Sequence, residues 1–438
     1  MFDNSLFSYG RRGIALALLV TGSFLVTGCG DDDDDVDDDV SAVSGRVDGG
    51  VGGTAPAQIE GATVSLARIN SSGNLETVSS EAATSDAEGR FRVETDLDNV
   101  RYLVVVADKG STHLEAVVAD AVQNGSEIKS QPLTQETTVE ARVWRAIVAD
   151  NKTSSVSLAD VATYITPSVA SGIAGNAAAI EAIATALEAE GDVRNAALAD
   201  AEFGVTTTEL NVINQARANA LANLDEALLA ADTQAEIDAA WQAWYTADAA
   251  AYATGSVDLD AILRAREIAS RALLNSTGSL SPSVELSVVR GAALARAAVL
   301  TMATQDAFLD ANATAGERTT VANAGTTLIN AIKAATTEQA ILNAFDTYHD
   351  TLLARLQVVY PLRSTALTTV NDALYASSGP RATLLTTVGT STNPTVLVPA
   401  YVDYFNSATT AVSTSLVGAP QAEIDIATRV LLDTSLIM

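Results

Sequence analysis

The pattern of hydrophobic and polar positions changes character near Pro132. Between about residue 41 and that point, short alternating segments rich in β-branched residues are separated by Gly, Asn and Asp; beyond it, hydrophobic residues recur at helical spacing almost to the C-terminus. A period of two residues is typical of half-buried strands, and a period of 3.6 is typical of amphipathic helices. The sequence therefore predicts a multidomain α+β protein, in which a small antiparallel β-sandwich precedes a large all-α region.

Seven candidate strands lie in the first part, separated by turn signals such as those at 70–73 and 86–89. They are predicted at 42–47, 62–69, 75–78, 90–94, 102–107, 114–118 and 128–133. Many short strands at this spacing within about 90 residues favour a two-sheet sandwich.

Four motifs in this region resemble the carboxypeptidase regulatory-like domain. They are VSGRV at 43–47, GATVSL at 61–66, TSDAEGRF at 84–91 and YLVVV at 102–106. The resemblance implies a seven-stranded, transthyretin-like sandwich over residues 41–133, with Asp86 and Gly89 shaping a hairpin and Phe91 pointing inward. In that family the domain is an accessory module, and no His-x-x-Glu motif of an accompanying zinc peptidase follows in this chain.

Helical periodicity divides the rest of the chain into connecting helices at 134–175, a first helical unit at 176–280, a second at 281–380 and a C-terminal helical tail at 381–438. Each unit is expected to contain four helices. They are predicted at 176–202, 207–231, 234–253 and 259–275, and at 284–311, 318–335, 338–359 and 364–376. Thr233 with Glu236, and Thr336 with Gln339, have the spacing of capping boxes at the third helix of each unit.

An internal repeat with an offset of 104 residues relates the two units. The sequence Ala-Asn-Ala at 218–220 returns at 322–324, and Trp241 and Trp244 align with Phe345 and Tyr348. Alanine bias does not explain a match of aromatic positions. The repeat predicts tandem helical-bundle units that pack alike, and a shorter echo of 234–238 at 421–425 suggests a truncated third copy.

The N-terminal 28 residues have the layout of a secretory signal peptide. Arg11 and Arg12 precede an apolar stretch at 14–26, which is short of the ~20 residues that span a bilayer comfortably. The sequence Val-Thr-Gly-Cys at 26–29 resembles the lipobox of bacterial lipoproteins. This resemblance implies cleavage before Cys29, acylation (palmitate among the chains) of that cysteine, and attachment to a membrane.

Gly30 is the residue after the cysteine. In enterobacterial lipoproteins an Asp at this position favours retention in the inner membrane, so the resemblance points to the outer membrane. Eight of the nine residues at 31–39 are aspartate. Like charges this close together repel and extend a chain, so 29–40 is interpreted as a lipidated cysteine and an acidic tether. The alternative, a calcium loop of the helix-loop-helix type, lacks its central glycine and terminal glutamate.

Composition restricts the partners. A formal net charge of −29 argues against nucleic acid. Cys29 is the only cysteine, so no disulfide can form within the chain.

Candidate chemistry is sparse. Of the two histidines, His349 follows Asp346 by three positions, a spacing that could serve a metal, but the positions 104 residues earlier are Gln242 and Tyr245. We expect His349 to be an exposed helical residue and His113 to lie at a strand edge without a partner. No nucleophile elbow, phosphate-binding loop or dinucleotide-binding motif occurs. No catalytic, cofactor-binding or metal-binding residue is therefore expected.

Trp241, Trp244, Tyr245 and Tyr252 form an aromatic stripe at helical spacing. The stripe either fills the core between helices or presents Trp241, Trp244 and Tyr245 as a surface that binds a protein or a glycan.

The expected function is that of a non-enzymatic lipoprotein of the cell envelope, anchored in a membrane, that binds or scaffolds another envelope component. The alternative is an envelope hydrolase whose site is assembled from scattered residues, with His349 as a base.

Overall fold

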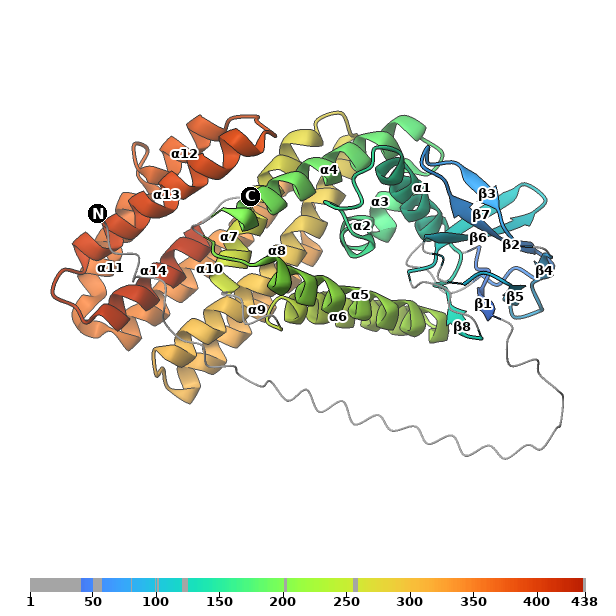
Figure 1. Ribbon diagram of the computed structural model, residues 1–438. Coiled ribbons are helices and arrows are strands. Elements are labelled where there is room, and N and C mark those ends of the chain that lie inside the picture. Colours follow the sequence, from blue (N-terminus) through green and yellow to red (C-terminus); the bar gives the residue numbers. More distant parts are fainter. Residues whose placement is uncertain are drawn as a thin grey trace.

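A computed structural model describes residues 41–49, 57–79, 81–98, 100, 102–119, 125–200, 203–254 and 259–435. Cys29 and the acidic tether lie outside this part of the chain. Two β-sheets lie at one end of an elongated body, and helices form the rest (Figure 1). The mixed α+β class predicted from the two periods is confirmed.

The strands are β1 (Ser41–Arg46), β2 (Thr63–Ile69), β3 (Leu75–Thr77), β4 (Ala83–Thr84), β5 (Arg90–Thr95), β6 (Leu103–Lys109), β7 (Thr112–Val117) and β8 (Glu127–Lys129). One sheet has the order β5-β1-β8, and the other β3-β2-β6-β7 with β4 also on β2. Strand pairs are antiparallel except β1 with β8, which is parallel. The expectation of an antiparallel sandwich is wrong at this edge, because β8 runs parallel to β1.

The turn before β5 forms as its sequence predicts. The Asp86 carboxylate accepts hydrogen bonds from the backbone N–H of Glu88 (3.0 Å) and Arg90 (2.7 Å), and Gly89 has φ +74°. Phe91 points into the sandwich core, as expected. Its ring lies so close to β1 that a Cβ at Gly45 would stand 2.7 Å from it, which explains the glycine inside that strand.

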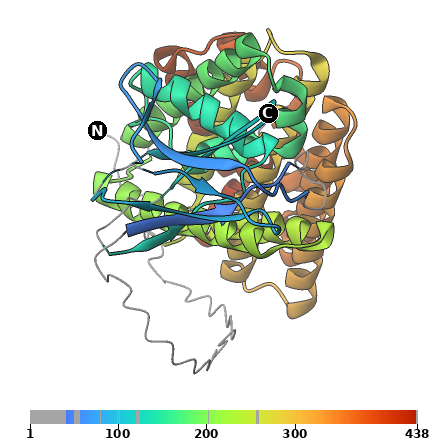
Figure 2. The same cartoon turned by 90° about the vertical axis from the view of Figure 1, so that its right-hand side faces the viewer.

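Strand β6 is buried on both faces. Leu103, Val105 and Ala107 pack in the core between the sheets, whereas Val104 and Val106 face the opposite way, into the core of the helical region. Helix α1 (Gln135–Ala149) covers that outer face with Val139, Val143, Trp144 and Ile147, among others. One hydrophobic core therefore runs from the outer face of the sheet into the helices. Figure 2 views the molecule from this end, with the strands in front of the helices.

The remaining helices are α2 (Leu158–Tyr164), α3 (Pro167–Ile173), α4 (Ala177–Ala199), α5 (Thr207–Ala230), α6 (Gln234–Ala251), α7 (Leu259–Ser276), α8 (Pro282–Asp310), α9 (Ala315–Ala334), α10 (Glu338–Val359), α11 (Ser364–Tyr375), α12 (Pro380–Val388), α13 (Pro394–Ser415) and α14 (Gln421–Ser435). The eight helices predicted in the two units all occur, with ends within three residues of prediction. Periodicity and caps were sufficient to locate them.

Capping follows the prediction in the first unit only. Thr233 and Glu236 form a capping box at the start of α6. At α10 the cap is Thr337, whose side chain accepts from the backbone N–H of Ala340, so the predicted box of Thr336 and Gln339 is wrong. Two adjacent threonines offered the same signal, and the second one lies where the chain enters the helix.

The two helical units do not pack alike. Helix α4 packs along α7, whereas α8 packs along α9. Trp241 is half-buried at the edge of a small cluster between α2, α5 and α6, but Phe345 is buried in the main core. The expectation that these two aromatic residues share one environment is wrong, although Trp244 and Tyr348 are both buried.

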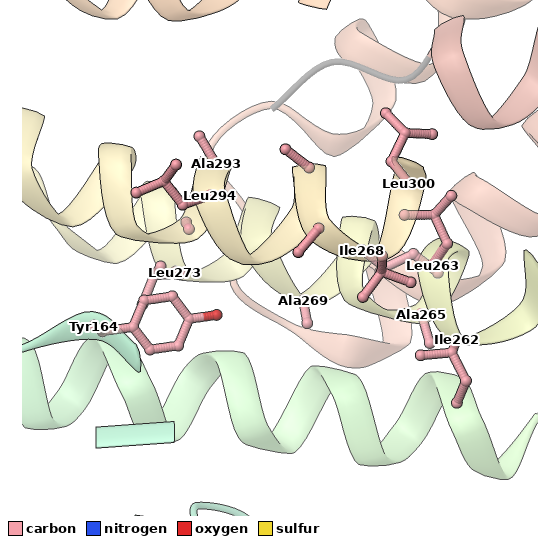
Figure 3. Close-up of a cluster of buried hydrophobic side chains, with 14 of the residues drawn as sticks. Tyr164, Ile262, Leu263, Ala265, Ile268, Ala269, Leu273, Ala293, Leu294 and Leu300 are labelled. Carbon is pink, nitrogen blue, oxygen red and sulfur yellow. The ribbon is translucent and has the colours of Figure 1, made fainter. Parts of the chain in front are cut away.

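Helix α8 is long and apolar enough to cross a membrane, the one such helix among the described residues. Within its most apolar stretch, however, 78% is buried inside the protein. Figure 3 shows Ala293, Leu294 and Leu300 of α8 lying against side chains of α7 such as Leu263, Ile268 and Leu273. The helix is the centre of the helical core.

Candidate functional site

The aromatic stripe is largely core. Trp244 has 2% of its surface exposed and Tyr252 has 4%. Trp241 and Tyr245 are half-buried, with their ring centroids 6.4 Å apart. A surface that presents all of Trp241, Trp244 and Tyr245 to a ligand is therefore contradicted, because the central residue fills the space between α5 and α6.

His349 is also buried, at 2% exposure, and the expectation of an exposed histidine is wrong. Its Nδ1 lies 2.6 Å from Oγ1 of Thr434, and its Nε2 lies 2.7 Å from Oδ1 of Asn371. Burial lowers the pKa of His349 despite the contact with Asn371. The buried ring, with both nitrogens engaged, joins α10 to α11 and α14 and is poorly placed to take a proton from a substrate.

His113, expected to lack a partner, lies between two carboxylates. Its Nδ1 is 2.8 Å from Asp108 and its Nε2 is 3.0 Å from Glu115. Burial lowers its pKa, but these hydrogen bonds raise it more. Glu115 is buried and also binds Arg145 of α1 (3.1 Å), so this group links the sandwich to the first helix.

A buried group of charges lies where α2, α4, α5, α6 and α7 converge. Asp160 is 1% exposed and accepts from two arginines: Arg194 through Nη1 (2.9 Å) and Nη2 (3.0 Å), and Arg217 through Nη1 (2.7 Å). Arg194 also binds buried Glu190 (3.1 Å). Burial raises the pKa of Asp160, but the two guanidinium groups outweigh it and hold that pKa far below its usual range.

The network continues across the α5–α6 hairpin. Arg217 donates from Nε to Asp248 at 2.6 Å, and Arg266 of α7 lies 3.9 Å from the same carboxylate. Both guanidinium groups stack on the Tyr252 ring, at 5.3 and 4.7 Å from its centroid. Three arginines thus face three carboxylates, and the charges balance within the network.

Local structure brings these groups together. The Ser157 and Asp160 side chains form the capping box of α2, which fixes the carboxylate at the start of that helix. Gly191 lets α4 approach closely, because a Cβ there would lie 2.5 Å from the carbonyl oxygen of Ser155. Arg194, one turn later, donates to that same carbonyl at 2.8 Å.

This network can position helices, but its chemistry does not suit proton transfer. Asp160 stays ionised, and arginine does not lose its proton near neutral pH. Sequence reasoning missed it because charged residues within amphipathic helices look like a solvated face. The one available signal was their position in the helical period, since Arg217 falls in register with the buried residues Ala220, Leu221 and Leu224.

A second buried group lies on α1, where Glu136 and Glu140 occupy adjacent turns. Gln131 donates to Glu140 at 3.1 Å, and Oε1 of Glu136 has no hydrogen-bond partner among the described residues. Burial raises the pKa of both, that of Glu140 to about 8. The pair is therefore largely protonated at neutral pH.

Within the described ranges, no set of three or more His, Cys, Asp or Glu side chains is arranged to hold a metal ion. Compared with known protein families, with curated proteins and with solved structures, the chain matches none of them.

Proposed function

We propose that this protein is a lipid-anchored component of the bacterial cell envelope whose rigid body binds or scaffolds another envelope component. The signal layout and the lipobox-like sequence ending at Cys29 support the anchor. The acidic run that follows would hold the folded body away from the membrane surface. An extended chain adds at most about 3.5 Å of separation per residue.

The observation that carries the scaffolding proposal is the continuity between sandwich and helices. Val104 and Val106 of the sheet share a core with α1, and Arg145 binds Glu115. On the other side, Arg46 of β1 donates to the carbonyl of Ala231 at the end of α5 (2.9 Å). An accessory sandwich fixed at two places to a helical body is suited to presenting that body in a defined orientation.

We also infer that the α5–α6 and α9–α10 hairpins descend from one duplicated hairpin. The connecting residues 231–233 and 335–337 are 104 apart, as in the sequence repeat. Ala231 and Ala335 end their helices alike, with ψ 127° and 132° and an N–H bonded to the carbonyl three residues back. The rest of each four-helix unit packs differently, so this inference covers the hairpins alone.

A pull-down from envelope extracts with the lipid-free protein tests the binding proposal, and Arg46→Ala serves as a variant with a loosened sandwich. A partner retained by the wild type and by His349→Ala is the expected result. Turnover of an envelope polymer that His349→Ala abolishes, without any partner, would favour the hydrolase alternative.

A further inference from the structure

Exposed apolar side chains gather at one end of the body, and we call them the apolar end patch. The patch consists of Leu362, Val417 and Val358, which are 93%, 81% and 53% exposed and are the three most exposed large hydrophobic residues of the described chain. Leu362 lies in the short helical turn (Pro361–Arg363) that follows α10, Val358 lies on the last turn of α10, and Val417 lies between α13 and α14. Helices α11 and α14 are at the end of the body farthest from the strands (Figure 1).

The two turns that carry the patch are held side by side. Nη2 of Arg363 donates to the carbonyl oxygen of Gly418 at 3.3 Å, and its Nε lies 3.2 Å from Oε2 of Glu423. Leu362 and Val417 directly precede the two bonded residues, so they flank this contact. Large apolar side chains scattered singly on a surface are ordinary, whereas neighbouring ones mark interaction sites.

Negative charge is scarce around the patch. Residues 351–371 and 404–422 contain no Asp or Glu, although the chain has 54 acidic residues among 438. The carboxylate of Glu317 on α9 approaches α10 and is paired there with Arg355 at 3.5 Å. A body with a net charge of −29 is repelled by negatively charged surfaces, and this repulsion is weakest where its own carboxylates are absent or paired.

The size of the patch favours a lipid surface over a protein partner or a second copy of the chain. Stable protein interfaces bring together ~20–30 residues a side, whereas only three exposed side chains form this patch. Aliphatic residues in adjoining turns, with the half-buried Tyr360 and a basic residue beside them, have the composition of segments that enter the interfacial layer of a bilayer. So small a contact binds weakly alone, but an anchor on the same chain raises its effective concentration to about the millimolar range.

We propose that the apolar end patch contacts the surface of the membrane that holds the anchor, so that the body is attached at both ends and lies along the bilayer. This inference rests on the lipid anchor of the proposed function. Residues 30–40, if fully extended, separate Cys29 from Ser41 of β1 by at most about 40 Å, so the sandwich end stays near the same membrane. The patch then sets an orientation that the anchor alone leaves free.

Fluorescence of the acylated mature protein in phosphatidylcholine vesicles tests this contact. Because acylation blocks Cys29, Val417→Cys supplies a single free thiol for an environment-sensitive dye such as nitrobenzoxadiazole. On vesicles the dye should emit at shorter wavelength and be shielded from aqueous iodide. Leu362→Asp should lower the ratio of membrane-bound to free dye by at least about tenfold, since each methylene withdrawn from lipid changes partitioning about fourfold. Val212→Asp, the same change of charge at an exposed valine of α5, should leave the ratio unaltered.

A dye whose emission and iodide quenching are the same on vesicles as in vesicle-free Cys29→Ser/Val417→Cys protein would overturn the contact. An effect of Val212→Asp equal to that of Leu362→Asp would overturn it as well. Shielding that grows with protein concentration in the absence of vesicles would assign the patch to a second copy, and would also contradict the proposal.

Labelling of the wild type separates this contact from the anchor. With Cys29 acylated, the wild type should take up no dye, and uptake would count against the anchor rather than the patch. Titration of Cys29→Ser/Val417→Cys protein with vesicles then decides the contact by itself: the dye should shift at high lipid concentration, and no shift would overturn the proposal.

Discussion

The Nε atom of Arg217 donates to the carboxylate of Asp248 at 2.6 Å, deep inside the α5–α6 hairpin. The residues 104 positions later are Val321 and Leu352, both completely buried. The two hairpins therefore reach a similar form with a charge pair in one and an apolar pair in the other. Because apolar pairs often replace buried ion pairs without loss of stability, the charges act mainly to fix α5 against Asp160 of α2.

Removing both members of this pair should cost less stability than the sum of removing each one alone. Asp248→Leu leaves the guanidinium of Arg217 without one of its partners, and we expect it to cost about 3–5 kcal/mol. The double variant Arg217→Val/Asp248→Leu, which copies the second hairpin, should cost less than the sum of the single variants by at least about 1 kcal/mol. Denaturant unfolding measures these differences, and strict additivity would contradict the coupling.

The carboxyl of Glu140 should make stability depend on pH. Its pKa is about 8 in the folded state, against 4.5 for the ordinary side chain. The folded protein keeps a proton that the unfolded chain loses, so this contribution is fully present below about pH 4.5 and is lost as pH rises toward 8. Glu140→Gln should reduce the dependence of the melting temperature on pH between pH 5 and 8. Exposed Glu338→Gln is the control and should follow the wild type; a Glu140→Gln profile as steep as the wild type would refute the assignment.

Burial separates the two tryptophans of α6. Trp244→Ala should destabilise the protein by about 3–5 kcal/mol, because it opens a cavity between α5 and α6. Trp241→Ala should cost clearly less, since its ring is half-buried at the edge of the cluster. Thermal unfolding of both variants gives the comparison. Equal losses would mean that Trp241 belongs to the core after all.

Gly191 should tolerate no side chain. A methyl group there would lie 2.5 Å from the Ser155 carbonyl and push α4 away from the loop before α2. Gly191→Ala should therefore lower the melting temperature and weaken the contact between Arg194 and Asp160. At Gly316 in α9 a Cβ meets nothing closer than 3.8 Å, so Gly316→Ala should be neutral or stabilising by up to about 1 kcal/mol. A stable Gly191→Ala protein would show that the loop yields.

Sequence periodicity was sufficient for most of the strands, the helices and the hairpin at Asp86, because each depends on local pattern and turn chemistry. The two-residue strand β4 was not predicted, and the strand predicted at 128–133 is only Glu127–Lys129. Contacts between residues far apart in the sequence could not be predicted in this way. The parallel β1–β8 edge, the engaged ring of His349 and the arginines around Asp160 all depend on residues far apart in sequence. The aromatic stripe was ambiguous for a related reason: helical spacing defines a face, but only packing decides whether that face is covered.

Metabolic labelling of the expressing bacteria with an alkyne fatty acid, followed by envelope fractionation, tests whether Cys29 carries the membrane anchor. The wild type should incorporate the label and sediment with membranes, whereas Cys29→Ser should carry no label and be released in soluble form. Equal labelling of both proteins, or membrane attachment that persists in Cys29→Ser, would contradict the anchor on which the proposed function depends.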